Sequence, residues 1–245
     1  MSAAFFPTGA ETSVQPGLRQ PLWDRPGNPL LDETFVQADA TVQVTPAYTR
    51  AGIGFVFQPA TIFELRVRYS AIGFYDAFTA VYLFDDPDAV YDAALRATMD
   101  RTTGWGGRLL VEPTIRMKGG PIVFVGWSAV RHHTLHPGET TDQGDYWLEP
   151  ELGLMLRYPG TSWDHNALLT WEVQAHDTTL YLGGYLDYRT AGQTSDELLR
   201  VGPAAVWMPE PDHWTVIAIC QFYAFARLRD GPVPPYTAFQ VQYRL

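Results

Sequence analysis

Cysteine is almost absent from this chain of 245 residues, and no long hydrophobic run is present. The single cysteine, Cys220, excludes a framework of intramolecular disulfides and leaves the redox compartment open. A membrane-spanning helix needs about 18 consecutive apolar residues, whereas the richest apolar stretch, Thr215 to Ala226, is short and is interrupted by Gln221. We therefore expect neither a disulfide scaffold nor a transmembrane helix.

Basic residues and catalytic motifs are also scarce. The 17 Lys and Arg residues are outnumbered by 27 Asp and Glu residues, and the resulting net charge of -10 argues against nucleic acid as a partner. The sequence has no Gly-rich phosphate loop and no CxxC, HExxH or GxSxG motif. No common enzyme class is therefore favoured by a motif.

Aromatic residues, by contrast, make up 14% of the chain, and apolar and polar residues alternate along most of it after residue 35. Between Trp147 and Tyr158, for example, apolar residues at every second position alternate with residues that include Glu149, Glu151 and Arg157. A period of two residues is typical of a strand with one apolar face. Turn residues separate the candidate strands, which are 35–45, 48–58, 62–74, 107–118, 121–132, 145–158, 165–175, 178–190, 198–208, 213–226 and 235–245.

This rhythm predicts an all-β fold, namely a closed antiparallel up-and-down transmembrane β-barrel. Because such barrels usually have an even number of strands, we expect about 12, with 10 possible. Residues 1–34, rich in Pro and Gly, are expected to form an irregular N-terminal arm or plug, and residues 35–245 the barrel. Asp86 to Asp100 carries the one helical signal, so a short helix is expected in a long extracellular loop, 75–106.

Alternation alone leaves open which face is outside, and a soluble β-barrel with an apolar ligand in its interior is an alternative. Three features favour an outward apolar face. The apolar faces are too bulky for one small interior, glycines such as Gly54, Gly153 and Gly183 fall on the polar faces, and aromatic residues cluster near strand ends, as in membrane-interface girdles. The residues that we expect to face lipid are Leu152, Leu154, Trp171, Val173, Leu180, Leu182 and Val241.

The last residues of the chain carry a further signal. Phe239, Val241, Tyr243 and Leu245 alternate with polar residues up to the C-terminus. This pattern resembles the C-terminal strand of Gram-negative outer-membrane β-barrel proteins, although that family usually ends in Phe. The resemblance implies a bacterial outer-membrane location, insertion by the barrel assembly machinery, and contact with outer-membrane lipids and lipopolysaccharide. It implies no particular activity.

Met1 to Val14 contains no Lys or Arg and does not look like an export signal. We therefore expect that a signal peptide has been removed from this chain.

Seven acidic and seven basic side chains fall on the predicted inner face. Unpaired charges in a narrow interior are costly, so this balance predicts a cross-strand network of ion pairs that fills the lumen. The protein is then expected to be a narrow or plugged channel, or a membrane anchor that binds a partner protein through its loops or N-terminal arm. The predicted lumen network comprises Asp39, Glu64, Arg66, Arg68, Glu112, Arg116, Glu149, Glu151, Arg157, Glu172, Asp187, Arg189, Arg200 and Arg244.

Candidate catalytic groups are few. Ser128 and His132 share a strand face, but four residues along one strand separate them by about 13 Å, which is too far for a Ser–His hydrogen bond. His133 and His136 lack a defined metal-ligand spacing. We therefore expect no catalytic residue, no metal site and no cofactor, and keep an outer-membrane lipid-modifying or hydrolytic enzyme as the alternative.

Overall fold

The computed structural model describes residues 2–6, 9–23, 30–31, 33–75, 81–89, 99, 102–138, 144–149, 151–175, 178–209, 213–227 and 235–243. This part of the chain is all-β, and its elements form one large and one small antiparallel sheet. None of its helices is long and apolar enough to span a membrane.

The strands are β1 (Ser2–Phe6), β2 (Gly9–Val14), β3 (Gly17–Pro21), β4 (Phe35–Val44), β5 (Tyr48–Ala60), β6 (Phe63–Phe74), β7 (Leu83–Phe84), β8 (Gly104–Gly119), β9 (Ile122–Pro137), β10 (Tyr146–Glu149), β11 (Leu154–Arg157), β12 (Gly160–Ala175), β13 (Thr178–Ala191), β14 (Glu197–Met208), β15 (Trp214–Ala226) and β16 (Tyr236–Tyr243). Ten of the eleven predicted strands therefore belong to the large sheet, and only 145–158 does not.

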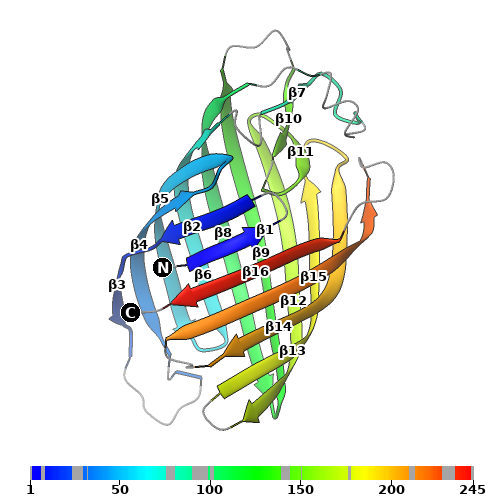
Figure 1. The fold of residues 1–245 in the computed structure, drawn as a ribbon. Coiled ribbons are helices and arrows are strands. Elements are labelled where there is room, and N and C mark those ends of the chain that lie inside the picture. Colours follow the sequence, from blue (N-terminus) through cyan, green and yellow to red (C-terminus); the bar gives the residue numbers. More distant parts are fainter. Residues whose placement is uncertain are drawn as a thin grey trace.

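The large sheet forms a curved, barrel-shaped wall (Figure 1). Its 13 strands follow the order β2-β1-β16-β15-β14-β13-β12-β9-β8-β6-β5-β4-β3. An additional antiparallel pairing of β2 with β4, from Thr12–Val44 to Val14–Val42, links the two sides of this order. Apart from this N-terminal region, consecutive wall strands are neighbours, as expected for an up-and-down fold.

The N-terminal prediction was wrong in one respect, because residues 1–34 are not irregular throughout. β1 pairs with β16, and β2 and β3 pair with successive halves of β4. Pro16 lies between β2 and β3, where its missing N–H removes no ladder hydrogen bond. The pairing partners lie far away in sequence, so local composition did not reveal these strands. The expected helix at 86–100 lies mostly outside the described residues.

Segment 145–158 was predicted as one wall strand, and this prediction was wrong. It forms a hairpin in which β10 pairs with β11, and β7 pairs with β10 to complete the small three-stranded sheet. Gly153, with φ of 67°, lies in the turn between the two strands, a conformation that favours glycine. We call residues 146–157 the inserted hairpin. Figure 1 shows it among the wall strands at one end of the barrel-shaped sheet.

The connections between wall strands fall at two ends of the sheet. The long segment 75–103 joins β6 to β8 at the same end as the inserted hairpin and the connection 227–235. We call this the long-loop end. The opposite, short-turn end carries the connections 61–62, 120–121, 176–177 and 209–213.

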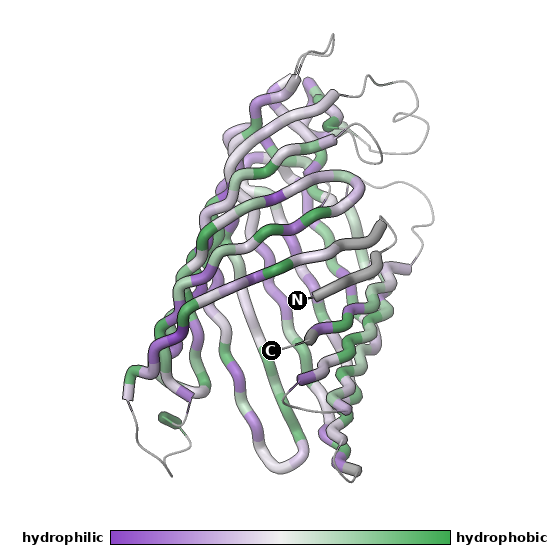
Figure 2. The backbone as a smooth tube through the Cα atoms, turned by 60° about the vertical axis from the view of Figure 1, so that its left-hand side comes forward, coloured by the Kyte–Doolittle hydropathy of each residue, from purple (hydrophilic) through white to green (hydrophobic). Residues whose placement is uncertain are grey.

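Side-chain exposure shows which face of the wall is outside. Apolar side chains such as Ile53 and Leu169 are 69% and 56% exposed, whereas Asp187, on the opposite face, is 1% exposed. The polar face therefore points inward along the wall, and Figure 2 shows the matching alternation of hydrophobic and hydrophilic positions. Among the residues predicted to face lipid, Trp171, Val173 and Leu182 are exposed, Leu180 and Val241 are intermediate, and Leu152 and Leu154 are buried.

Leu152 and Leu154 are buried because the inserted hairpin packs inside the wall. Together with Trp147 and Leu156 they contact inward-facing apolar residues of the wall, among them Phe74. At the long-loop end the inner face is thus apolar, and it becomes charged further along each strand. This buried group, the hairpin core, comprises Ala47, Tyr48, Ile72, Phe74, Val81, Leu83, Leu135, Trp147, Leu152, Leu154, Leu156, Ala191 and Leu198.

We predict that Leu154→Ala loosens the inserted hairpin, because truncating a fully buried leucine leaves a cavity that costs about 2–5 kcal/mol. Amide hydrogen exchange of Leu154–Arg157 should become faster. The matched change Leu169→Ala, on the exposed face, should leave these amides unaffected. Equal exchange in both variants would contradict the packing of the hairpin core.

Candidate functional site

The tip of the inserted hairpin is held by three arginines from separate parts of the wall. Glu151 Oε2 accepts hydrogen bonds from Arg50 on β5 at 2.8 Å and from Arg108 on β8 at 2.6 Å. Arg189 on β13 donates to the backbone oxygens of Glu151 and Leu152 at 3.0 and 2.9 Å. Five steps in the strand order separate β5 from β13, so this clamp crosses the interior. It fixes the hairpin tip in the lumen.

The neighbouring Glu149 is the buried acid of the inserted hairpin. Its side chain accepts a hydrogen bond from Leu152 N–H, and the residue is 1% exposed. Burial and the adjacent charge of Glu151 raise the pKa of Glu149 to about 8. For Glu151, burial alone would raise the pKa, but the guanidinium groups of Arg50 and Arg131 hold it below its ordinary value. At neutral pH the pair therefore consists of one protonated and one ionised carboxyl group.

Below the clamp, charged side chains of neighbouring strands pair along the wall. Arg68 on β6 contacts Asp39 on β4 at 2.8 Å, and the Asp39 side chain is fully buried. Gly54 lies between them on β5, where an added Cβ would be 2.7 Å from Asp39 Oδ1. The glycine therefore leaves the space that this buried ion pair occupies.

A second group of ion pairs lies toward the short-turn end. Arg66 contacts Glu64 at 3.1 Å and Glu112 at 3.2 Å, and Arg116 contacts Glu64 at 2.7 Å. The side chains of Arg66 and Arg116 are 33% and 40% exposed although they face inward. Nearest this end, Lys118 pairs with Glu172 at 2.7 Å. Solvent therefore reaches the inner face from the short-turn end.

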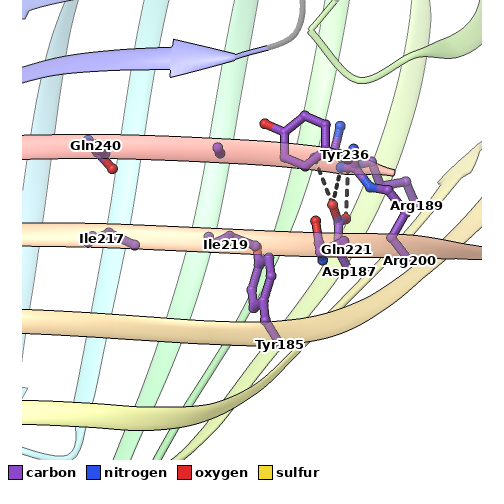
Figure 3. Close-up of a pocket in the computed structure, with 10 residues that line it drawn as sticks. Tyr185, Asp187, Arg189, Arg200, Ile217, Ile219, Gln221, Tyr236 and Gln240 are labelled. Atoms are coloured by element: carbon purple, nitrogen blue, oxygen red, sulfur yellow. Dashed lines mark hydrogen bonds and ion pairs between the residues drawn. The ribbon is translucent and has the colours of Figure 1, made fainter. Parts of the chain in front are cut away.

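The third group centres on Asp187, which is 1% exposed. Arg189 contacts both of its carboxylate oxygens at 2.8 and 2.9 Å, and Arg200 pairs with the same carboxylate. Figure 3 shows both guanidinium groups meeting Asp187 beside Tyr236 and Gln221. One acid thus faces two bases, and Arg189 connects this group to the clamp on the hairpin tip.

The structure brings most of the predicted lumen residues together in pairs, with three exceptions. Glu149 lies on β10 of the inserted hairpin and accepts a hydrogen bond from Leu152 N–H. Arg157 is not part of this arrangement, because it lies in the inserted hairpin, where its side chain is 52% exposed and contacts Asp145 at 3.4 Å. The wall-strand interpretation of 145–158 caused this error. Arg244 lies outside the described residues.

Sequence reasoning missed five charged residues of the lumen: Arg50, Arg108, Lys118, Arg131 and Asp164. Arg131 pairs with Asp164, which is 3% exposed. Positions two residues apart along a strand face the same side. The three arginines and Lys118 could therefore have been found, because each lies an even number of residues from the inward-facing side chains of its own strand. Asp164 was missed because β12 begins at Gly160, five residues before the predicted strand start.

A serine and a histidine meet on the outer face of the wall. Ser128 Oγ on β9 lies 2.8 Å from His165 Nδ1 on β12, directly across the ladder. The His165 ring stacks on Tyr188, with 6.1 Å between centroids and an interplanar angle of 10°. The Tyr188 hydroxyl donates to Glu197 at 3.0 Å. The partner of Ser128 is therefore on the neighbouring strand rather than at His132.

In the described part of the chain, no group of three or more His, Cys, Asp or Glu side chains could hold a metal ion. Two of the histidines weighed from sequence point to opposite faces. His132 contacts Thr161 on the outer face, while His133 is 2% exposed and lies beside Ser162.

We predict that docking of the inserted hairpin weakens as pH rises. The docked pKa of Glu149 is above its ordinary value, so the docked state holds a proton that the released hairpin loses. This stabilisation is complete below about pH 4.5 and is lost as pH rises to about 8. Glu149→Gln removes the titration. The difference in unfolding free energy between variant and parent should therefore grow in favour of the variant from pH 5 to pH 8, and parallel pH profiles would contradict this assignment.

No protein-family model matches this sequence, and no curated protein matches it. Among solved structures, the chain resembles a KdgM porin with a TM-score of 0.41 and 9% sequence identity, over 100% of this chain and 96% of that chain. Identity and structural overlap at this level are too low to transfer a function or a location from that protein.

Proposed function

We propose that this chain is an outer-membrane β-barrel whose lumen is plugged at one end, and that it acts as a narrow or plugged channel or as an anchor rather than as an enzyme. The observation that carries this proposal is the inserted hairpin, which is clamped by Arg50, Arg108 and Arg189 and packed in an apolar core inside a wall of inward charges. The surrounding lipids and lipopolysaccharide, and the barrel assembly machinery during insertion, are the partners that such a location implies.

The outer face supports the membrane location. Side chains as large as Trp171 on β12, Phe222 on β15 and Ile53 on β5 are more than half exposed. Soluble monomers rarely expose apolar patches of such extent. Lipid hydrocarbon would cover this apolar face, while the backbone N–H and C=O groups of the wall are hydrogen-bonded within the sheet.

Closure of the wall is also part of the proposal. The three residue pairs between β2 and β4 join the N-terminal strands to the other side of the sheet. A barrel with paired edges leaves fewer backbone groups to face lipid than an open sheet would.

We predict that the protein remains folded only in detergent or lipid and shows heat-modifiable migration on gels. Stable, monomeric protein without detergent would instead favour a soluble barrel.

In planar bilayers we predict that the parent conducts almost no current, because the hairpin core and the clamp block the long-loop end. Replacing residues 146–157 by a Gly/Ser linker of equal length should produce steady currents.

The control for this experiment replaces residues 228–234, which belong to a connection at the same end, by a linker of equal length and should stay silent. Large steady currents from the parent would refute the plug. Silence of the folded hairpin variant would refute it as well and would favour the anchor.

A second candidate function, lipid ester hydrolysis on the outer face, is favoured by the 2.8 Å contact between Ser128 and His165. In this reaction Ser128 Oγ attacks an acyl carbonyl while His165 takes its proton and passes it to the leaving alcohol. Water then releases the acyl group. Stacking on Tyr188 would orient the imidazole.

We predict for this second function that a fluorophosphonate probe labels Ser128 and that Ser128→Ala lowers ester hydrolysis at least about 100-fold. The matched control is Ser162→Ala, because Ser162 also lies beside a histidine, at 3.4 Å from His133 Nε2, but faces inward and is buried. Equal activity of Ser128→Ala and the parent would exclude this function.

A further inference from the structure

A cavity of about 170 Å³ opens on the inner face beside the Asp187 group, between β13, β14, β15 and β16. Its polar side is formed by Asp187, Arg189, Arg200 and Gln221 (Figure 3). Its apolar side includes Ile217, which lies toward the short-turn end and is not buried. Two aromatic residues, Tyr185 and Tyr236, also line it. The cavity thus combines charged, aromatic and aliphatic surfaces.

Gln221 is a buried amide without a hydrogen-bond partner. The residue is 0% exposed, and neither its Oε1 nor its Nε2 is paired. Arg200 Nε, at the same cavity, is also unpaired, and Arg200 is 4% exposed. Buried polar groups normally have partners, and leaving them without one is costly. The amide N–H group of Gln221 and the unpaired Nε–H of Arg200 are two donors that match the two acceptor oxygens of a carboxylate.

The charges at the cavity point to an anion. Asp187 is shared by Arg189 and Arg200, so the three side chains together carry one net positive charge. Arg189 is fully engaged, because its remaining guanidinium nitrogen donates to two hairpin carbonyls. Arg200 therefore provides the free cationic donor, and one carboxylate would neutralise the group.

The rest of the cavity fits a flat apolar body of limited size. The guanidinium carbon of Arg200 lies 4.2 Å from the Tyr236 ring centroid, so the cationic donor and an aromatic face adjoin each other. Ile219 and Ala238 add aliphatic surface. An apolar cavity of about 150 Å³ in another protein holds benzene, so this cavity has room for one aromatic ring with a small substituent.

We propose that this cavity binds a small aromatic monocarboxylate, with benzoate as the simplest probe. The carboxylate contacts Arg200 Nε and the Gln221 amide, and the ring lies against Tyr185, Tyr236 and the aliphatic residues. Entry is from the short-turn end, where inward side chains such as Arg116 are partly exposed. Binding does not require the chain to conduct, so this inference stands apart from the proposed function.

The test is isothermal titration of the detergent-solubilised full chain with benzoate. Saturable binding is expected, and benzyl alcohol, which has the same ring without the charge, should bind at least roughly tenfold more weakly. Gln221→Met should weaken benzoate binding at least roughly tenfold without lowering the melting temperature, because the amide has no partner to lose.

The matched control is Gln174→Met, since Gln174 lies on β12 away from the cavity and contacts Glu172. It should bind benzoate like the parent. Absence of saturable binding to the folded parent, meaning that the cavity holds water only, would overturn the proposal. Equal affinity for benzyl alcohol, or unchanged affinity in Gln221→Met, would overturn it as well.

Discussion

Charge pairing inside a narrow, sheet-walled interior is the constraint on which the rest of this structure depends. Each wall strand that places apolar side chains outward necessarily turns alternate positions inward. Here many of these positions carry arginines and acids, and cross-strand partners lie within hydrogen-bond distance of them. Register is thereby constrained twice, since a slip of one residue would expose the charges and also bury the apolar face.

The inserted hairpin contacts both the apolar part and the charged part of the wall's inner face. Its leucines and Trp147 pack where the wall's inner face is apolar, and its tip reaches the first charged residues. Glu151 supplies a carboxylate to Arg50 and Arg108. Removal of the hairpin would therefore expose an apolar surface to water and take this carboxylate away from two arginines, which explains why the hairpin and the wall form one structural unit.

Alternation in the sequence predicted the wall strands and the inward direction of most charges. These features depend only on the two-residue repeat of a strand and on which set of alternate positions is polar. Alternation could not identify the inserted hairpin. Residues 146–157 alternate like a wall strand, and a leucine that faces lipid has the same local pattern as one packed against Phe74. Gly153 is the local sign of a turn, but the alternation places it on the polar face of a strand. The pairing of β1 with β16, the unpaired amide of Gln221 and the Ser128–His165 contact depend on neighbours distant in sequence, so no local pattern reveals them.

The clamp on the hairpin tip also has a consequence for the order of assembly. Its arginines come from β5, β8 and β13, and the hairpin itself lies in the chain between β9 and β12, which are neighbours in the wall. The tip can be gripped only after strands on both sides of the hairpin have come together, because Arg189 follows it by 38 residues. Non-local contacts of this kind require loop closure before they stabilise the fold. The three contacts of the clamp can therefore form only when the wall strands on both sides of the inserted hairpin are already in place.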